Sequence, residues 1–137
     1  MPWTRECAAA RTRPKLEQLA EPDPNRQLRL VARNARVLNE RAGRLLEVVR
    51  AAARAEADID AIWHDINAER LTRARKTATA LARKAQLRGT VAHAARTLWT
   101  LTLPELYGAQ LHDGGVTAAT YERWLGDVLI AALLSDP

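Results

Sequence analysis

Side chains that could carry out catalysis are few and scattered in this chain. The histidines are His64, His93 and His112, and Cys7 has no neighbouring base pattern that would activate a thiolate. Asp60 and His64 lie one helical turn apart, which permits a surface ion pair, whereas a zinc site requires more ligands. The sequence therefore predicts a protein that is not an enzyme and that has no cofactor and no metal site.

The tryptophans are better candidates for a functional role. Trp63, Trp99 and Trp124 fall within apolar stripes of three separate expected helices. Large aromatic side chains with a polar N–H group suit pocket walls and subunit interfaces. Simple filling of the hydrophobic core is the alternative interpretation.

The net charge of +5 is unevenly distributed along the chain. Residues 70–96 contain no acid and eight cations: Arg70, Arg73, Arg75, Lys76, Arg83, Lys84, Arg88 and Arg96. Such a basic stripe can face nucleic acid or a membrane surface, and a solvated helix face is the plainer alternative.

Length and composition limit the class of protein. A chain of 137 residues suits one domain, and its hydrophobic fraction of 47% supports a buried core. No apolar run reaches the roughly 18 residues that a membrane span needs, and the first residues do not form a secretory signal. A single cysteine suits a reducing compartment, so the sequence predicts a cytoplasmic protein.

The first residues differ from the rest. Prolines interrupt them at positions 2, 14, 22 and 24, so we expect a loose arm over residues 1–22 and a helical domain over residues 23–137. Asp23 followed by Pro24 is typical of a helix start, with aspartate as the N-cap and proline in the first turn.

Apolar residues at helical spacing predict a succession of helices beyond this point. Gly43 is expected to break or kink the first helix, and a short second helix follows to about Ala55. Asp58 is the expected N-cap of a long third helix, with Gly89 as the residue that follows its end. The first apolar stripe consists of Leu28, Val31, Ala35 and Leu38.

Capping residues and breakers divide the C-terminal part. Thr90 and Thr117 are the expected N-caps of two helices, and Gly114 with Gly115 is expected to end the segment between them. Pro104 either kinks that segment or restarts the helix, because proline lacks the N–H donor. With no alternating strand pattern, the sequence predicts an all-α, single-domain bundle of five or six helices.

Four stretches carry a family resemblance: residues 23–30, 58–63, 98–107 and 121–129. In order and spacing they resemble the C-terminal effector-binding and dimerisation domain of tetracycline-repressor-like (TetR family) transcriptional regulators. The stretch from Trp99 to Tyr107 is the most specific of the four, and the likeness extends from Asp23 onward.

The resemblance implies that the bundle binds a small, usually apolar molecule and that two copies join through their last two helices in a four-helix contact. The ligand-lining residues that it implies are Leu45, Val49, Trp63, Ile66, Leu71, Leu81, Leu98 and Trp99. The dimer-interface residues that it implies are Leu101, Leu106, Tyr107, Tyr121, Trp124, Leu125, Val128 and Leu129.

The chain departs from this family at its start. The family reads DNA through an N-terminal helix-turn-helix, and residues 1–22 contain no such pattern, so DNA binding by this chain alone is not expected. Three interpretations stay open: a gene truncated at its start, a stand-alone sensor, or a partner that forms a heterodimer with an intact related regulator.

A nucleic-acid-binding helical protein is the alternative function. Its phosphate contacts would come from the stripe between Arg70 and Arg88, through Arg70, Arg73, Lys76, Arg83 and Lys84. Against this alternative, no aromatic residue lies between positions 64 and 98, so a base-stacking platform is missing from the stripe itself.

Overall fold

The computed structural model describes residues 17–136, and these residues form an all-α bundle. Its elements are α2 (Pro24–Ala53), α3 (Ala57–Ala82), α4 (Val91–Leu101), α5 (Pro104–Gly108), the π-helical turn η1 (Ala109–Asp113) and α6 (Ala118–Leu133). Residues 17–20 are also helical. Residues 17–136 contain no strand, and their extended pairing is a single bridge between Leu87 and Leu134. The predicted fold class is confirmed.

Side-chain caps begin three of the helices as predicted. The Asp23 carboxylate accepts a hydrogen bond from the Asn25 amide at 3.1 Å, and Pro24 occupies the first turn of α2. The hydroxyls of Thr90 and Thr117 accept from backbone amides three residues later, at 3.0 and 3.1 Å. Each cap satisfies a donor that the first helical turn would otherwise leave open.

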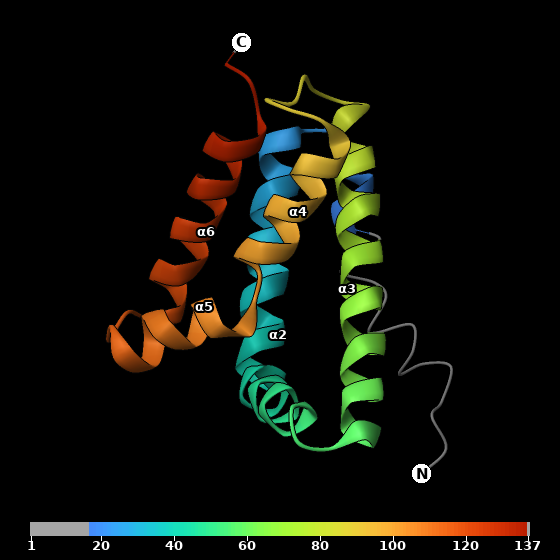
Figure 1. Ribbon diagram of the computed structural model, residues 1–137. Helices are drawn as coiled ribbons and strands as arrows, with labels where there is room; N and C mark the ends of the chain where they lie inside the picture. Colours follow the sequence, from blue (N-terminus) through green and yellow to red (C-terminus); the bar gives the residue numbers. More distant parts are fainter. Residues whose placement is uncertain (1–16, 137) are drawn as a thin grey trace.

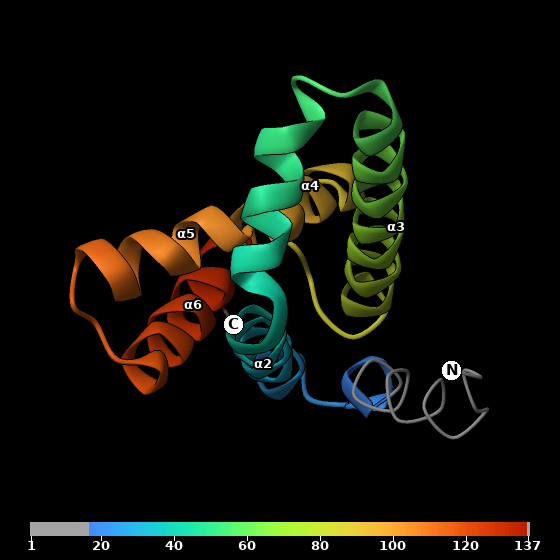
Figure 2. The same cartoon turned by 90° about the horizontal axis from the view of Figure 1, so that it is seen from below.

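The first long helix differs from the prediction. α2 continues through Gly43 without a break, so the two helices expected over residues 24–55 are one element. Figure 2 shows that α2 bends partway along its length. An interior glycine costs about 1 kcal/mol relative to alanine. The packing of α3, α5 and α6 against α2 can offset this cost.

Both ends of α3 also differ from the prediction. Glu56 rather than Asp58 is the N-cap residue, and its side chain makes no capping bond. α3 ends at Ala82, well before Gly89. The chain leaves the helix early because residues 86–88 pair with the C-terminal end, where the Arg88 amide donates to the Leu133 carbonyl oxygen at 2.9 Å.

Pro104 restarts the helix, which was one of the two outcomes expected for it. α4 ends at Leu101 and α5 begins at Pro104, where the missing N–H donor has no effect. The π-helical turn that follows α5 ends at Gly114 and Gly115, as predicted. Gly115 has a φ of +67°, a conformation that glycine adopts without strain.

Figure 1 shows how the helices are arranged. α2 runs through the middle of the molecule, with α3 antiparallel to it on one side and α6 on the other. α4 packs on α3 and also touches α6, and α5 packs against α2. Gly126 of α6 faces α2, where a Cβ atom at this position would lie 3.8 Å from the Cβ atom of Ala32.

The core lies between α2, α3, α4 and α6. Its largest fully buried hydrophobic side chains are Tyr121, Leu28, Leu81, Leu125, Leu129 and Leu133. Small residues, including Ala32 and Ala78, let the helices pack closely around these side chains. Of the first predicted stripe, Leu28 and Ala35 are buried, Val31 is partly buried and Leu38 is exposed.

A buried polar network attaches the segment before α2 to the bundle. Gln18 donates to the Thr77 hydroxyl at 2.8 Å and accepts from Gln27 at 2.8 Å. The Lys84 ammonium donates to the Gln27 side chain and to the carbonyl oxygen of Glu21, both at 2.7 Å. Packing therefore begins at least as early as Gln18, within the predicted arm of residues 1–22, and residues 1–16 lie outside the described part.

No helix within residues 17–136 is long and apolar enough to cross a membrane.

Candidate functional site

A group of polar side chains lies where α3 meets the junction of α4 and α5. We call Asn67, Arg70, Trp99, Thr102 and Glu105 the inner polar cluster. The Arg70 guanidinium donates through Nη2 to the Trp99 carbonyl oxygen at 3.2 Å and to the Thr102 hydroxyl at 3.3 Å. Its Cζ atom lies 5.8 Å from the centroid of the Trp99 ring, within the range of a cation–π contact. Arg70 therefore joins α3 to the end of α4.

The electrostatics of the cluster centre on Arg70. Burial lowers the pKa of its guanidinium, and the nearby charge of Arg73 lowers it further, whereas Glu105 acts in the opposite direction. Glu105 in turn pairs with Arg50 of α2. The cluster therefore connects three parts of the bundle through charged groups.

Four polar atoms of the cluster are buried without a hydrogen-bond partner. Two are donors, Nη1 of Arg70 and Nε1 of Trp99, and two are acceptors, Oδ1 of Asn67 and Oε2 of Glu105. Buried polar groups in folded proteins are nearly always paired, commonly with ordered water where protein partners are absent. The cluster therefore has unused capacity for water or for a small polar ligand.

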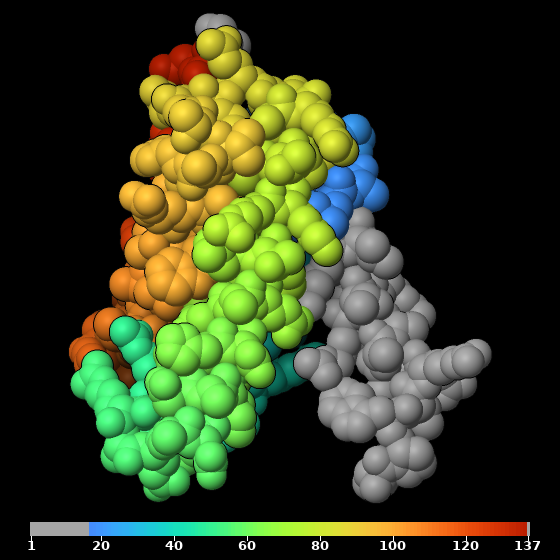
Figure 3. All heavy atoms as spheres, turned by 45° about the vertical axis from the view of Figure 1, so that its right-hand side comes forward, coloured from blue at the N-terminus to red at the C-terminus, as the bar shows by residue number. Residues whose placement is uncertain are grey.

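A surface groove lies beside this cluster, between α3 and α4. These helices lie side by side on the face shown in Figure 3. The groove has a volume of about 280 Å³. Its lining residues are Leu71, Arg75, Ala92, Ala95, Arg96 and Trp99. We call it the α3–α4 groove; it combines an apolar lining with two cations and no acid.

The structure separates the residues that were predicted to line one ligand pocket. Leu71 and Trp99 line the α3–α4 groove, whereas Leu81 and Leu98 are buried in the core. Val49 is partly buried near the end of α2. Trp63 and Ile66 are partly buried in the first half of α3. Leu45 is 64% exposed on α2. A single pocket lined by all eight residues is therefore not formed by this arrangement.

The predicted dimer face is also divided. Tyr107, Tyr121, Leu125 and Leu129 are buried within their own chain, so a second copy could not contact them without opening the fold. The side chains that stay accessible are Trp124, which is 36% exposed, and Leu101, Leu106 and Val128, which are partly buried. The accessible part of the predicted face is therefore centred on Trp124.

The basic stripe is divided between the interior and the surface. Arg70 belongs to the inner polar cluster, and Lys84 holds the segment before α2. Arg88 lies 3.4 Å from the Asp136 carboxylate. Arg75, Lys76, Arg83 and Arg96 are exposed, and none of them has an ion-pair partner within residues 17–136.

The residues considered for catalysis do not form a reactive group. Nε2 of His64 lies 3.5 Å from an Asp60 carboxylate oxygen, and both side chains are largely exposed, which makes them a surface pair. Within residues 17–136, no group of three or more histidine, cysteine, aspartate or glutamate residues could hold a metal ion. Cys7 lies outside the described residues.

Sequence reasoning missed Asn67 and Glu105 and assigned Arg70 only to the basic stripe. Asn67 and Arg70 lie three residues apart, so they share one face of α3. The same face carries the buried Ala74, so the charge of Arg70 on it could have indicated that Arg70 lies inside the bundle.

No protein-family model, curated protein or solved structure matches the chain.

Proposed function

We propose that this chain is a non-catalytic, regulator-like helical module that forms a dimer through the outer side of α6 and binds a small molecule between its middle helices. The proposal joins the resemblance of residues 23–129 to the C-terminal domain of TetR family regulators with the surface of α6. The observation that carries it is an uncharged stripe on that helix.

The stripe consists of Thr120, Trp124, Val128 and Ala131, and we call it the outer stripe of α6. The spacings of four, four and three residues place these side chains along one side of the helix. Three of them are exposed, and Val128 is partly buried. An exposed tryptophan within an uncharged stripe is typical of a protein interface.

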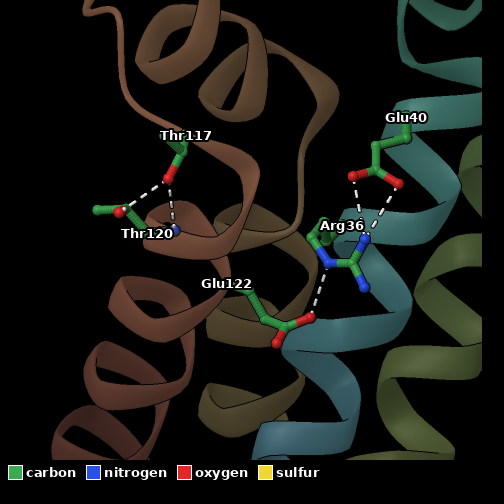
Figure 4. Close-up of polar contacts among 5 residues, drawn as sticks. All are labelled: Arg36, Glu40, Thr117, Thr120 and Glu122. Atoms are coloured by element: carbon green, nitrogen blue, oxygen red, sulfur yellow. Dashed lines mark hydrogen bonds and ion pairs between the residues drawn. The ribbon is translucent and has the colours of Figure 1, made fainter.

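The two acids of α6 pair with arginines of α2. Figure 4 shows Arg36 between Glu122 of α6 and Glu40 of its own helix. Nε of Arg36 donates to Glu122 at 2.8 Å, and these contacts with both glutamates raise the pKa of the Arg36 guanidinium. Asp127 pairs with Arg29 at 2.8 Å. Glu122 and Asp127 therefore join α6 to α2, and the exposed cation Arg123 flanks the outer stripe.

Dimerisation and ligand binding would be connected through the order of the helices. α4 packs on α3, where a ligand would bind, and also touches α6. A ligand that favours one tilt of α4 would shift α6, and with it the geometry of the dimer. Only a differential affinity for the two arrangements can produce such a shift.

The dimer is tested by light scattering of the full chain after size exclusion. We expect the wild-type protein to be a dimer at micromolar concentration and Trp124→Glu to be a monomer that keeps its helical circular dichroism spectrum. Val91→Glu is the matched control, because Val91 is 38% exposed against 36% for Trp124 and lies on α4. A monomeric wild-type protein, or equal effects of the two variants, would refute the proposal.

The alternative, nucleic-acid binding, has one observation in its favour. The structure places Trp99 beside Arg75 and Arg96, so an aromatic side chain adjoins the cations that remain exposed. Of the five residues predicted to contact phosphates, Arg73, Lys76 and Arg83 are not engaged inside the bundle. Electrophoretic mobility shift at two salt concentrations tests this alternative, which requires binding that weakens steeply with salt.

A further inference from the structure

We infer that the α3–α4 groove is a binding site for a small organic anion, namely an aromatic or aliphatic carboxylate held by Arg75 and Arg96. This inference rests on the ligand-binding part of the proposed function and does not depend on dimerisation. It also changes the expected ligand class. The resemblance implies an apolar molecule, whereas the groove favours a molecule with a negative charge.

The first argument is charge. Arg75 of α3 and Arg96 of α4 both line the groove, none of the six lining residues is acidic, and neither guanidinium has an ion-pair partner within residues 17–136. Arg70 adds a third positive charge behind the Trp99 ring. A carboxylate bound in the groove can accept hydrogen bonds from arginine side chains that line it, and it neutralises part of their positive charge.

The second argument is shape. Leu71, Ala92, Ala95 and Trp99 provide the apolar part of the lining, alongside the two cations. A volume of about 280 Å³ lies just below the range of roughly 300–1,000 Å³ that holds drug-sized ligands. The groove therefore suits a small molecule with one apolar body and one charged end.

The third argument is an unused donor on a lining residue. Trp99 contributes to the wall of the groove, and its indole N–H is buried without an acceptor among the described residues. A buried donor of this kind indicates a missing water molecule or ligand atom. A carboxylate has two acceptor oxygens, so it can serve both the arginines and, after a small shift of the ring, the indole N–H.

Nuclear magnetic resonance titration of the full chain with 2-naphthoate tests the site. Trp99→Phe identifies the indole signal of Trp99, which we expect to shift on binding. For an open groove we expect a dissociation constant of about 0.1–1 mM. We expect the neutral analogue 2-naphthylmethanol to bind at least about fivefold more weakly, because it cannot pair with the arginines.

Two variants locate the ligand. Arg96 lines the α3–α4 groove and not the neighbouring hollow on α3, and we expect Arg96→Gln to weaken 2-naphthoate binding about three- to tenfold. Arg83→Gln is the matched control, because Arg83 is an exposed cation that lines a different hollow of about 500 Å³ on α3. The control variant should bind 2-naphthoate as the wild-type protein does.

Several results would overturn the inference. Absence of any shift up to about 5 mM ligand, equal affinity for the charged and neutral compounds, or a loss of binding in Arg83→Gln but not in Arg96→Gln would each do so. If duplex DNA displaced 2-naphthoate and the affinity for DNA fell with salt, the groove would be a nucleic-acid site instead. A monomer that still binds 2-naphthoate would refute only the dimer.

Discussion

The guanidinium of Arg70 lies over the indole ring of Trp99 and donates to the backbone carbonyl oxygen of the same residue at 3.2 Å. One side chain of α3 therefore contacts both the ring and the backbone of a residue on α4. Trp99 also lines the α3–α4 groove, so this contact adjoins the surface at which we propose ligand binding. A ligand that moves the Trp99 ring would alter the contact between the two helices.

Replacing Arg70 tests the importance of this contact for stability. We expect Arg70→Gln to lower the free energy of unfolding by about 1–2 kcal/mol, because charge-assisted hydrogen bonds to Trp99 and Thr102 are lost while burial of the charged group is relieved. Guanidinium denaturation followed by circular dichroism measures the change. Arg73→Gln is the control and should change stability by less than about 0.5 kcal/mol. Equal losses in both variants would contradict this role.

Local features of the fold were predictable because they depend on neighbours in sequence. The caps Asp23, Thr90 and Thr117 each bond to an amide two or three residues away, so the residue type and its position suffice to predict them. Pro104 acts through its own missing donor. These residues set the start of α2, α4, α5 and α6.

Features that depend on distant residues were predicted less well. Gly43 does not end α2, because α6, α5 and α3 all pack along that helix, and α3 stops early because Leu87 pairs with Leu134 at the other end of the chain. The apolar stripe of α6 has the same spacing whether it faces its own chain or a partner. The sequence could therefore not show that Leu125 is buried within the monomer.

The inner polar cluster has the same origin. Arg70 and Trp99 are 29 positions apart on different helices, and Asn67 and Glu105 are 38 positions apart in the sequence. The packing of α4 on α3 brings Arg70 and Trp99 together, and the packing of α5 on α2 brings Glu105 to Arg50. The sequence identified Trp99 as a candidate, but not the polar side chains around it.

The glutamine network near the start of the described chain gives a second prediction. We expect Gln18→Ala to lower the free energy of unfolding by about 1–3 kcal/mol, because Gln27 and Thr77 would each lose a buried hydrogen-bond partner. Urea denaturation of the full chain measures the loss. Glu17→Ala changes an exposed neighbour and should have an effect below about 0.5 kcal/mol. If Gln18→Ala left the free energy of unfolding unchanged, the segment before α2 would not stabilise the bundle.

Tyr121 gives a prediction about alkaline pH. Its side chain is fully buried, and this burial raises the pKa of the hydroxyl from 10.0 to about 12, although the Asn39 side chain opposes the shift. In the unfolded chain the hydroxyl loses its proton near pH 10, whereas the folded protein retains it until about pH 12. Stability from this group is therefore complete below pH 10 and falls as the pH rises, by up to about 2–3 kcal/mol.

The Tyr121→Phe variant isolates this effect. The Tyr121 hydroxyl has no hydrogen bond of good geometry, so its removal should change stability at pH 8 by less than about 1 kcal/mol. Between pH 9 and pH 11.5 the variant should lose less stability than the wild-type protein in guanidinium denaturation. Burial also raises the pKa of Tyr107, which is present in both proteins, so the difference between them reports what the Tyr121 hydroxyl adds. Parallel losses in the two proteins would show that ionisation of Tyr121 does not contribute to the loss of stability at alkaline pH.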